Sequence, residues 1–111
     1  SEAEWDQMRD YLGGWQLMHG KVKTVGTEYW ISPNSDATNE SGLSVLPGGI
    51  RFDDGDFQYE SEQGFFWNTY GDDVMHASSG YTFFSDLPSE SYYIYTFNMM
   101  PFGQSVRCVK N

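Results

Sequence analysis

The sequence contains one cysteine, few basic residues and no long apolar run. The single thiol of Cys108 excludes an internal disulfide and a zinc site built from several cysteines. Six lysines and arginines stand against sixteen acidic residues, which leaves a net charge of −10. Nucleic-acid binding requires a basic surface that displaces counterions, so this charge excludes that class of function and also opposes binding to an anionic membrane.

Membrane and export signals are equally sparse. No apolar run approaches the roughly eighteen residues that a membrane span requires, so we do not expect the chain to be embedded in a membrane. No signal peptide or lipidation motif is visible, and any targeting segment is expected to lie outside this chain. An acidic surface is instead compatible with divalent cations and with uncharged partners such as glycans.

Aromatic residues dominate what is present. Eight Phe, eight Tyr and four Trp occur in 111 residues. Each such ring buries about 150–250 Å² when packed, which suffices for one core in a single domain of this length. The abundance of Tyr and the twelve glycines favour strands and loops over helices.

The first fourteen residues, SEAEWDQMRDYLGG, predict a helix. Ser1 and Glu4 fit a capping box, and apolar side chains recur at helical spacing in Trp5, Met8 and Leu12. The two glycines that follow end the helix, and WQLMHG predicts a short further helical turn. From residue 21 to residue 51 little periodicity is present, with one short strand predicted in KVKTVGTEYW.

The C-terminal half predicts an antiparallel meander. The Asp-Gly pair in FDDGDFQYE is typical of a hairpin turn, and strands are predicted in GFFWNTY, MHASSGYTFFSD, SYYIYTFNM and QSVRCVKN. Cys108 in the last of these is interpreted as a buried strand cysteine or as half of a disulfide with a partner upstream. The whole chain is therefore predicted to be one α+β domain.

Residues 38–52, TNESGLSVLPGGIRF, form the connector between the two halves. We expect Asn39 and Ser41 to turn the chain through hydrogen bonds from their side chains to the backbone. The donors of Arg51 are expected to bridge buried carbonyls or a carboxylate. The connector is also predicted to contribute three side chains to the core, those of Leu43, Val45 and Leu46. It is then predicted to reverse direction at Pro47, Gly48 and Gly49. The alternative is that Asn39 and Glu40 contact a ligand.

The connector closely resembles the signature Thr-Asn-Glu-Ser-Gly-aromatic-Ser-Ala-Leu-Pro-Gly-Gly-Tyr-Arg of the Fibrobacter succinogenes major paralogous domain. Four further segments resemble that family in the same order, namely SEAEWDQMRDYLGG, GKVKTVGTEYWISPN, GFFWNT and SVRCVKN. Leu43 and Ile50 stand where the family has an aromatic residue and Tyr.

The resemblance implies a C-type-lectin-like fold, related to formylglycine-generating-enzyme and variable-protein domains. In such a fold a long irregular loop region packs on a small twisted antiparallel sheet and displays a variable surface. It also implies export to the surface of Bacteroidetes-like bacteria, often as a lipoprotein. Relatives often carry an upstream cysteine and strand, so we expect Cys108 to be unpaired here and the domain, residues 1–111, to lack its native N-terminal strand.

Catalytic and metal-binding chemistry is weakly indicated. His19 and His76 have no neighbours that suggest a catalytic triad, so the chain is not expected to be an enzyme. Asp53, Asp54 and Asp56 are candidate calcium ligands, but their spacing lacks the full EF-hand loop, and a solvated hairpin tip is favoured. The pair Ser32-Pro33-Asn34 and Trp67-Asn68-Thr69 resembles part of the calcium-bridged sugar site of C-type lectins.

Binding through aromatic side chains is the stronger prediction. Tyr and Trp make adaptable recognition surfaces, and rings stack on sugar faces. The candidate ligand-binding residues are Trp67, Asn68, Tyr70, Tyr93 and Tyr95. The sequence thus predicts a non-enzymatic extracellular recognition or adhesion module that binds a glycan or a surface protein. The alternative is a structural component of a phage or bacterial appendage, in which the aromatic surface is a subunit interface.

Overall fold

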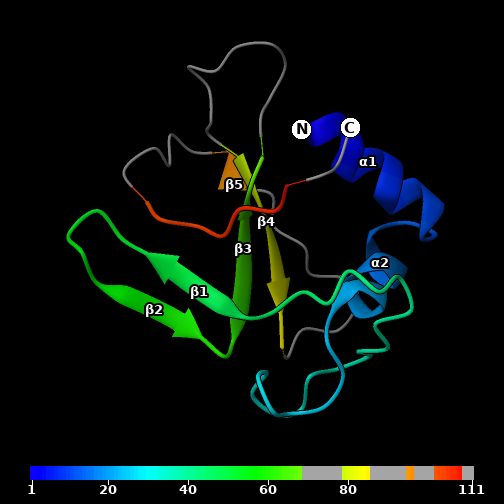
Figure 1. Cartoon of the computed structure of the whole chain (residues 1–111), viewed down its shortest axis with the longest axis horizontal. Helices are drawn as coiled ribbons and strands as arrows, with labels where there is room; N and C mark the ends of the chain where they lie inside the picture. The colour runs from blue at the N-terminus through cyan, green and yellow to red at the C-terminus, as the bar shows by residue number, and fades with distance from the viewer. Residues whose placement is uncertain (69–78, 86–94, 97–101, 109–111) are drawn as a thin grey trace.

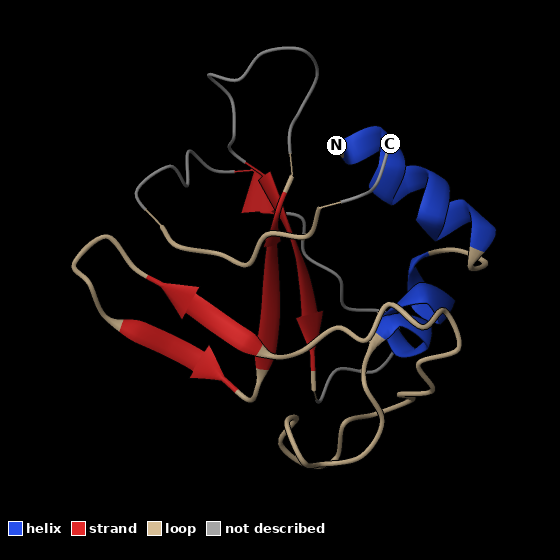
Figure 2. Cartoon of the chain, viewed as in Figure 1, coloured by secondary structure: helices blue, strands red, loops and turns tan. Residues whose placement is uncertain are grey.

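Two helices lie beside one five-stranded sheet in the computed structural model, which describes residues 1–68, 79–85, 95–96 and 102–108 (Figures 1 and 2). The α+β class predicted from the sequence is confirmed. The elements in chain order are α1 (Glu2–Tyr11), α2 (Trp15–Val22), β1 (Gly48–Arg51), β2 (Phe57–Glu60), β3 (Gln63–Trp67), β4 (Ser79–Phe84) and β5 (Tyr95–Thr96).

The predicted antiparallel meander is confirmed for β3, β4 and β5, which pair antiparallel in succession. The prediction of an antiparallel sheet is wrong at β1 and β3, because the sheet is mixed. Its strand order is β2-β1-β3-β4-β5. β1 pairs antiparallel with β2 across the predicted Asp-Gly turn, and β3 pairs antiparallel with β4. β2 runs antiparallel to β1 at the edge of the sheet, and β3 then pairs with the other side of β1 after the chain has reversed direction a second time. β1 and β3 are consequently parallel, with Gly49 opposite Gly64.

The C-terminal tail, defined here as residues 102–108, is not the regular strand predicted from QSVRCVKN. It makes two isolated bridges, antiparallel to β1 between Gly103 and Arg51 and parallel to β3 between Ser105 and Phe66. Since β4 occupies the other edge of β3, the tail and β1 share one edge. Cys108 lies exposed and free beyond these bridges, which overturns the interpretation as a buried strand cysteine.

Helix α1 forms as its sequence predicts. Ser1 and Glu4 make the capping box, and the Ser1 hydroxyl also donates to the Glu4 carboxylate at 2.8 Å. Trp5 and Leu12 are buried, whereas Tyr11 is 86% exposed on another side of the helix. Helix α2 extends past the predicted turn as far as Val22. Among the described residues, no helix combines the length and apolarity that crossing a bilayer requires.

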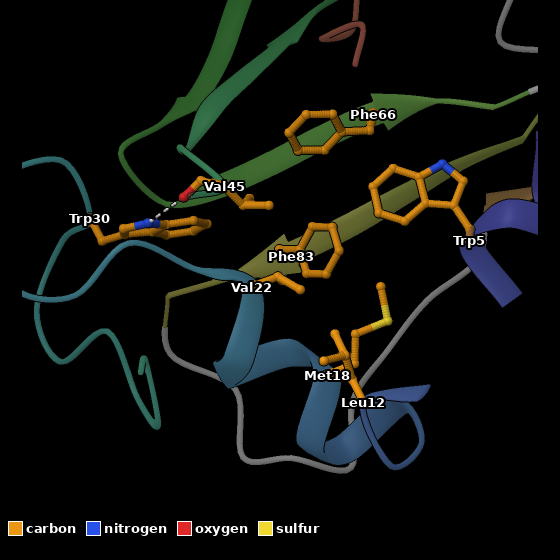
Figure 3. Close-up of a cluster of buried hydrophobic side chains, with 8 residues drawn as sticks. All are labelled: Trp5, Leu12, Met18, Val22, Trp30, Val45, Phe66 and Phe83. Carbon is orange, nitrogen blue, oxygen red and sulfur yellow. Dashed lines mark hydrogen bonds between the residues drawn. The ribbon is translucent and has the colours of Figure 1, made fainter. Parts of the chain in front are cut away.

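The core lies between the helices and the sheet (Figure 3). The rings of Trp5, Phe66 and Phe83 approach one another pairwise, with centroids 5.9–6.1 Å apart. Trp30 enters from the irregular region and donates its indole N–H to the carbonyl of Val45 at 3.2 Å, the dashed line of Figure 3. The core cluster comprises Trp5, Leu12, Met18, Val22, Trp30, Val45, Phe66 and Phe83.

The connector is tied to helix α2 and to itself. The Asn39 side chain accepts from the backbone N–H of Ser44 at 2.9 Å, and the Ser41 hydroxyl donates to the carbonyl of Lys21 at 2.9 Å. Val45 is buried, and its N–H donates to the carbonyl of Val22 at 2.8 Å. These contacts confirm the predicted side-chain turns and the predicted core contact of Val45.

Three other expectations for the connector are wrong. Leu46 is 45% exposed instead of filling the core. The glycines after Pro47 do not reverse the chain, because β1 begins at Gly48. Arg51 is exposed, with its guanidinium 5.9 Å from the ring centroid of Phe57, and it bridges no buried acceptors among the described residues.

Lys23 is the buried cation instead. It is fully buried, and its ammonium donates to the carbonyl of Ser35 at 2.8 Å while lying 5.4 Å from the ring centroid of Trp30. Lys23 belongs to the segment in which a strand was predicted. The structure contains only an isolated parallel bridge between Lys23 and Val45 there.

Candidate functional site

The surface beside α1 contains a hollow of about 290 Å³. Trp67, the last residue of β3, lies in its lining together with Trp5 and Met8 of α1. Leu43 of the connector and Arg107 of the tail also line it. The lining therefore combines apolar and polar surface, because Ser1, Glu4 and Arg107 add charged and polar groups to the apolar side chains.

A second hollow of about 330 Å³ adjoins the first. The two hollows have Trp5, Leu43 and Arg107 in common, and together they are here called the groove. The second part lies between residues 44–48 of the connector and residues 105–107 of the tail, with Val45 and Phe66 among its lining residues. Leu46 and Val106 line it from opposite walls, and they are 45% and 72% exposed.

Three segments far apart in the sequence create this groove. The tail reaches β3 because Ser105 donates to the carbonyl of Phe65 at 2.9 Å and accepts from the N–H of Trp67 at 3.0 Å. The connector is held by Val45, and α1 is held by Trp5 in the core. The hydrogen bonds of Ser105 and the core contacts of Val45 and Trp5 therefore fix the three segments that line the groove.

The predicted ligand-binding residues have different surroundings. Trp67 is half-buried and lines the groove, whereas the neighbouring Asn68 is only 5% exposed and has an interaction partner inside the protein. Tyr70 and Tyr93 lie outside the described residues. Tyr95 belongs to β5, but its side chain also lies outside the described part. Asn68 was predicted to contact a ligand at the surface, but its side chain is buried.

The calcium hypothesis gains no support from the described residues. Asp53, Asp54 and Asp56 are exposed around the hairpin turn, where a carboxylate oxygen of Asp54 accepts from the N–H of Asp56 at 2.9 Å. Nowhere in the described ranges do three or more His, Cys, Asp or Glu side chains form a group that could hold a metal ion. Asn34 is buried and donates to the carbonyls of Thr24 and Gly26, so its amide stabilises the loop.

The sequence did not reveal two ionisable residues at the C-terminal end of α2, His19 and Lys23, whose pKa values are shifted. Burial lowers the pKa of Lys23 to about 8, and the nearby Asp36 carboxylate opposes that shift. Burial also lowers the pKa of His19 to about 4, the charge of Lys23 acts in the same direction, and Asp36 opposes both. A lysine followed by mostly polar residues carries no sequence signal of burial, which is why the pair was missed.

The pKa of His19 predicts a specific loss of stability in acid. In the unfolded chain His19 has its ordinary pKa of 6.5, against about 4 in the folded protein. Between these values the unfolded state binds a proton that the folded state does not, so the free energy of unfolding falls as pH falls. We expect this residue to contribute about 2–3 kcal/mol of the loss between pH 7 and pH 4, allowing for its partial exposure.

Urea unfolding at several pH values between 7 and 4 tests this expectation. His19→Gln cannot titrate, so its stability should fall less steeply with acid than that of the wild type. The carboxylates that also titrate in this range are common to both proteins and cancel in the comparison. Parallel pH profiles for the two proteins would contradict the buried, neutral state of His19.

The family comparison covers almost the entire chain. The sequence model of the Fibrobacter succinogenes major domain matches residues 1–110, which include both helices, the connector, every described strand and the tail. A search of curated proteins found no match, and a search of solved structures found none either. The segments that build the groove therefore all lie within the matched domain.

Proposed function

Because this chain belongs to the Fibrobacter succinogenes major domain family, we propose that it is a non-enzymatic recognition or adhesion module with a C-type-lectin-like fold. In this proposal it acts at the cell surface, where it binds a glycan or a surface protein. The arrangement of α1, α2 and a long irregular region around a small sheet supports the proposed fold. The extracellular location rests on the resemblance described above.

The observation that carries the proposal is the position of Trp67 in the open groove. Its indole shares the lining with Trp5 and Met8, and such surfaces stack on sugar faces or pack against apolar side chains of a protein. The charged lining side chains are Glu4 and Arg107, one of each sign. This composition provides contact area and orientation, which suits recognition better than catalysis.

Replacement of Trp67 by alanine tests the proposed site. We expect Trp67→Ala to abolish binding on a glycan array or to cells that display the partner, because the largest aromatic surface of the groove is lost. Tyr11→Ala is the matched control, since Tyr11 is an exposed aromatic residue of α1 that does not line the groove. Tyr11→Ala should melt close to the wild type, whereas Trp67→Ala loses buried ring surface and should melt at a lower temperature. Binding is therefore compared at a temperature at which circular dichroism shows both variants folded.

Two results would contradict this assignment. Unchanged binding by Trp67→Ala would show that the ligand is bound elsewhere. A tight oligomer in light scattering, combined with no glycan or cell binding, would favour the alternative role as a structural component of an appendage. The exposed Leu46 and Val106 would then belong to a subunit interface.

A further inference from the structure

We propose that a polar pocket between α2 and residues 36–40 binds a sugar residue that carries a free amino group. The pocket has a volume of about 430 Å³, within the range of about 300–1,000 Å³ that is typical of small-molecule sites. It shares no described lining residue with the groove, and its described lining contains no residue of α1 or of the tail. The inference therefore goes beyond the proposed function and does not depend on the role of Trp67.

Two segments that are bonded to each other form the walls of the polar pocket. The lining side chains come from α2 and from the irregular region beside it (Figure 1), namely Gln16, Leu17, Lys21, Asp36, Thr38 and Glu40. The backbone N–H of Thr38 donates to the carbonyl of Gly20 at 2.9 Å, and the ammonium of Lys21 lies 3.7 Å from the Glu40 carboxylate. These contacts hold the walls together, so the polar groups are positioned before a ligand binds.

The polar pocket presents hydrogen-bond donors and acceptors together. Gln16 and Thr38 offer an amide and a hydroxyl, which both donate and accept, and the ammonium of Lys21 only donates. The carboxylates of Asp36 and Glu40 only accept. Sugar hydroxyls also donate and accept, whereas the ammonium of a lysine side chain can only donate. The mixed set therefore favours a sugar over a basic segment of a protein.

Leu17 adds an apolar surface to this polar set. It belongs to α2 and lines the pocket, and it is 55% exposed. The C–H groups on one face of a pyranose ring are apolar, so this face can cover the leucine side chain while the hydroxyls at the edge of the ring reach the polar groups. The pocket thus offers a surface for each side of a sugar ring.

Asp36 supplies the preference for an amino group. Glu40 is paired with Lys21, whereas the Asp36 carboxylate accepts no hydrogen bond and forms no ion pair among the described residues. Lys23 interacts with Asp36 electrostatically, but its ammonium is fully buried and is bonded to the carbonyl of Ser35. The exposed carboxylate of Asp36 therefore remains available to the ammonium group of a ligand, which the net charge of −10 also attracts.

Isothermal titration of the whole chain with three tetrasaccharides tests the inference. The probes are β-1,4-linked tetramers of glucosamine, of N-acetylglucosamine and of glucose. We expect the glucosamine tetramer to bind at least fivefold more tightly than the other two, because it alone carries ammonium groups that donate to Asp36. Equal affinity for the three probes, or no binding of the glucosamine tetramer, would overturn the inference.

Matched substitutions separate the pocket from the general acidity of the surface. Asp36→Asn removes the charge and keeps the shape, and Asn tolerates the φ of +58° at this position. It should weaken binding of the glucosamine tetramer at least fivefold. Glu28→Gln removes an exposed carboxylate outside the pocket and should change the affinity less than twofold. Equal weakening by the two variants would indicate non-specific attraction and would contradict the inference.

Gln16→Ala provides a second variant of the pocket. Gln16 is exposed, so its replacement should leave the fold intact, and the loss of the amide should weaken binding of the glucosamine tetramer at least threefold. Unchanged binding by both Gln16→Ala and Asp36→Asn would remove the inference. If Trp67→Ala alone abolished binding, the sugar would lie in the groove, and the proposed function would stand without this second site.

Discussion

Gly49→Ala is expected to lower the free energy of unfolding by about 4 kcal/mol, because an added methyl group has no space. The Cβ would overlap the carbonyl oxygen of Gln58 and would lie 2.8 Å from the backbone nitrogen of Glu60. Both obstacles are backbone atoms of β2, so no side-chain rotation relieves them. The φ of Gly49 is +66°, which adds conformational strain for any residue with a Cβ.

The register of the hairpin explains why the backbones are so close. Gly48 pairs with Glu60 and Ile50 pairs with Gln58, so Gly49 lies opposite Tyr59. Tyr59 itself has a φ of +62°, and its backbone turns toward β1 at this point. Gly49 is also the residue of β1 that pairs with β3. A displacement of its backbone would therefore alter the pairing of β1 and β3, beside which the tail lies.

Gly42→Ala is the matched control for this prediction. Gly42 has a similar φ of +70°, but an added Cβ would meet nothing within 4 Å. It should therefore lose only about 1–2 kcal/mol through backbone strain. Urea unfolding at neutral pH measures both variants, and equal losses would show that the close approach of β1 and β2 contributes nothing.

Gly20→Ala is expected to destabilise the protein by about 3 kcal/mol, although alanine in a helix is normally preferred over glycine by about 1 kcal/mol. Gly20 is buried within α2, and an added Cβ would overlap the carbonyl oxygen of Asp36 and lie 2.9 Å from its carbonyl carbon. The carbonyl of Gly20 also accepts from the N–H of Thr38 at 2.9 Å. The irregular loop is therefore packed directly on the helix backbone.

Gln16→Ala separates this effect from helix propensity. Gln16 is exposed and lies one turn earlier on α2, so its replacement should change the free energy of unfolding by less than about 0.5 kcal/mol. A Gly20→Ala variant that is as stable as the wild type, or more stable, would mean that residues 36–38 do not contact α2. The measurement is again urea unfolding, with helicity followed by circular dichroism.

Local structure was predictable where neighbouring residues determine it. The capping box of Ser1 and Glu4, the apolar spacing of α1 and the Asp-Gly turn between β1 and β2 all involve groups a few residues apart. The Asn39 side chain turns the connector for the same reason, since its partner Ser44 is near in sequence. The family match also follows from ordered sequence segments alone.

Tertiary structure decided the rest, because long-range packing leaves little local signal. The parallel pairing of β1 and β3, the burial of Lys23 and the exposure of Arg51 depend on which segments meet. The groove depends on this most, since α1, the connector and the tail come together only after β3 has returned beside β1. The sequence alone determined the α+β class and the family, and it predicted Trp67 as a candidate ligand-binding residue. The fold decided that Trp67 lies in the lining of the groove and that Asn68 is buried, because these surroundings depend on which segments pack around the end of β3.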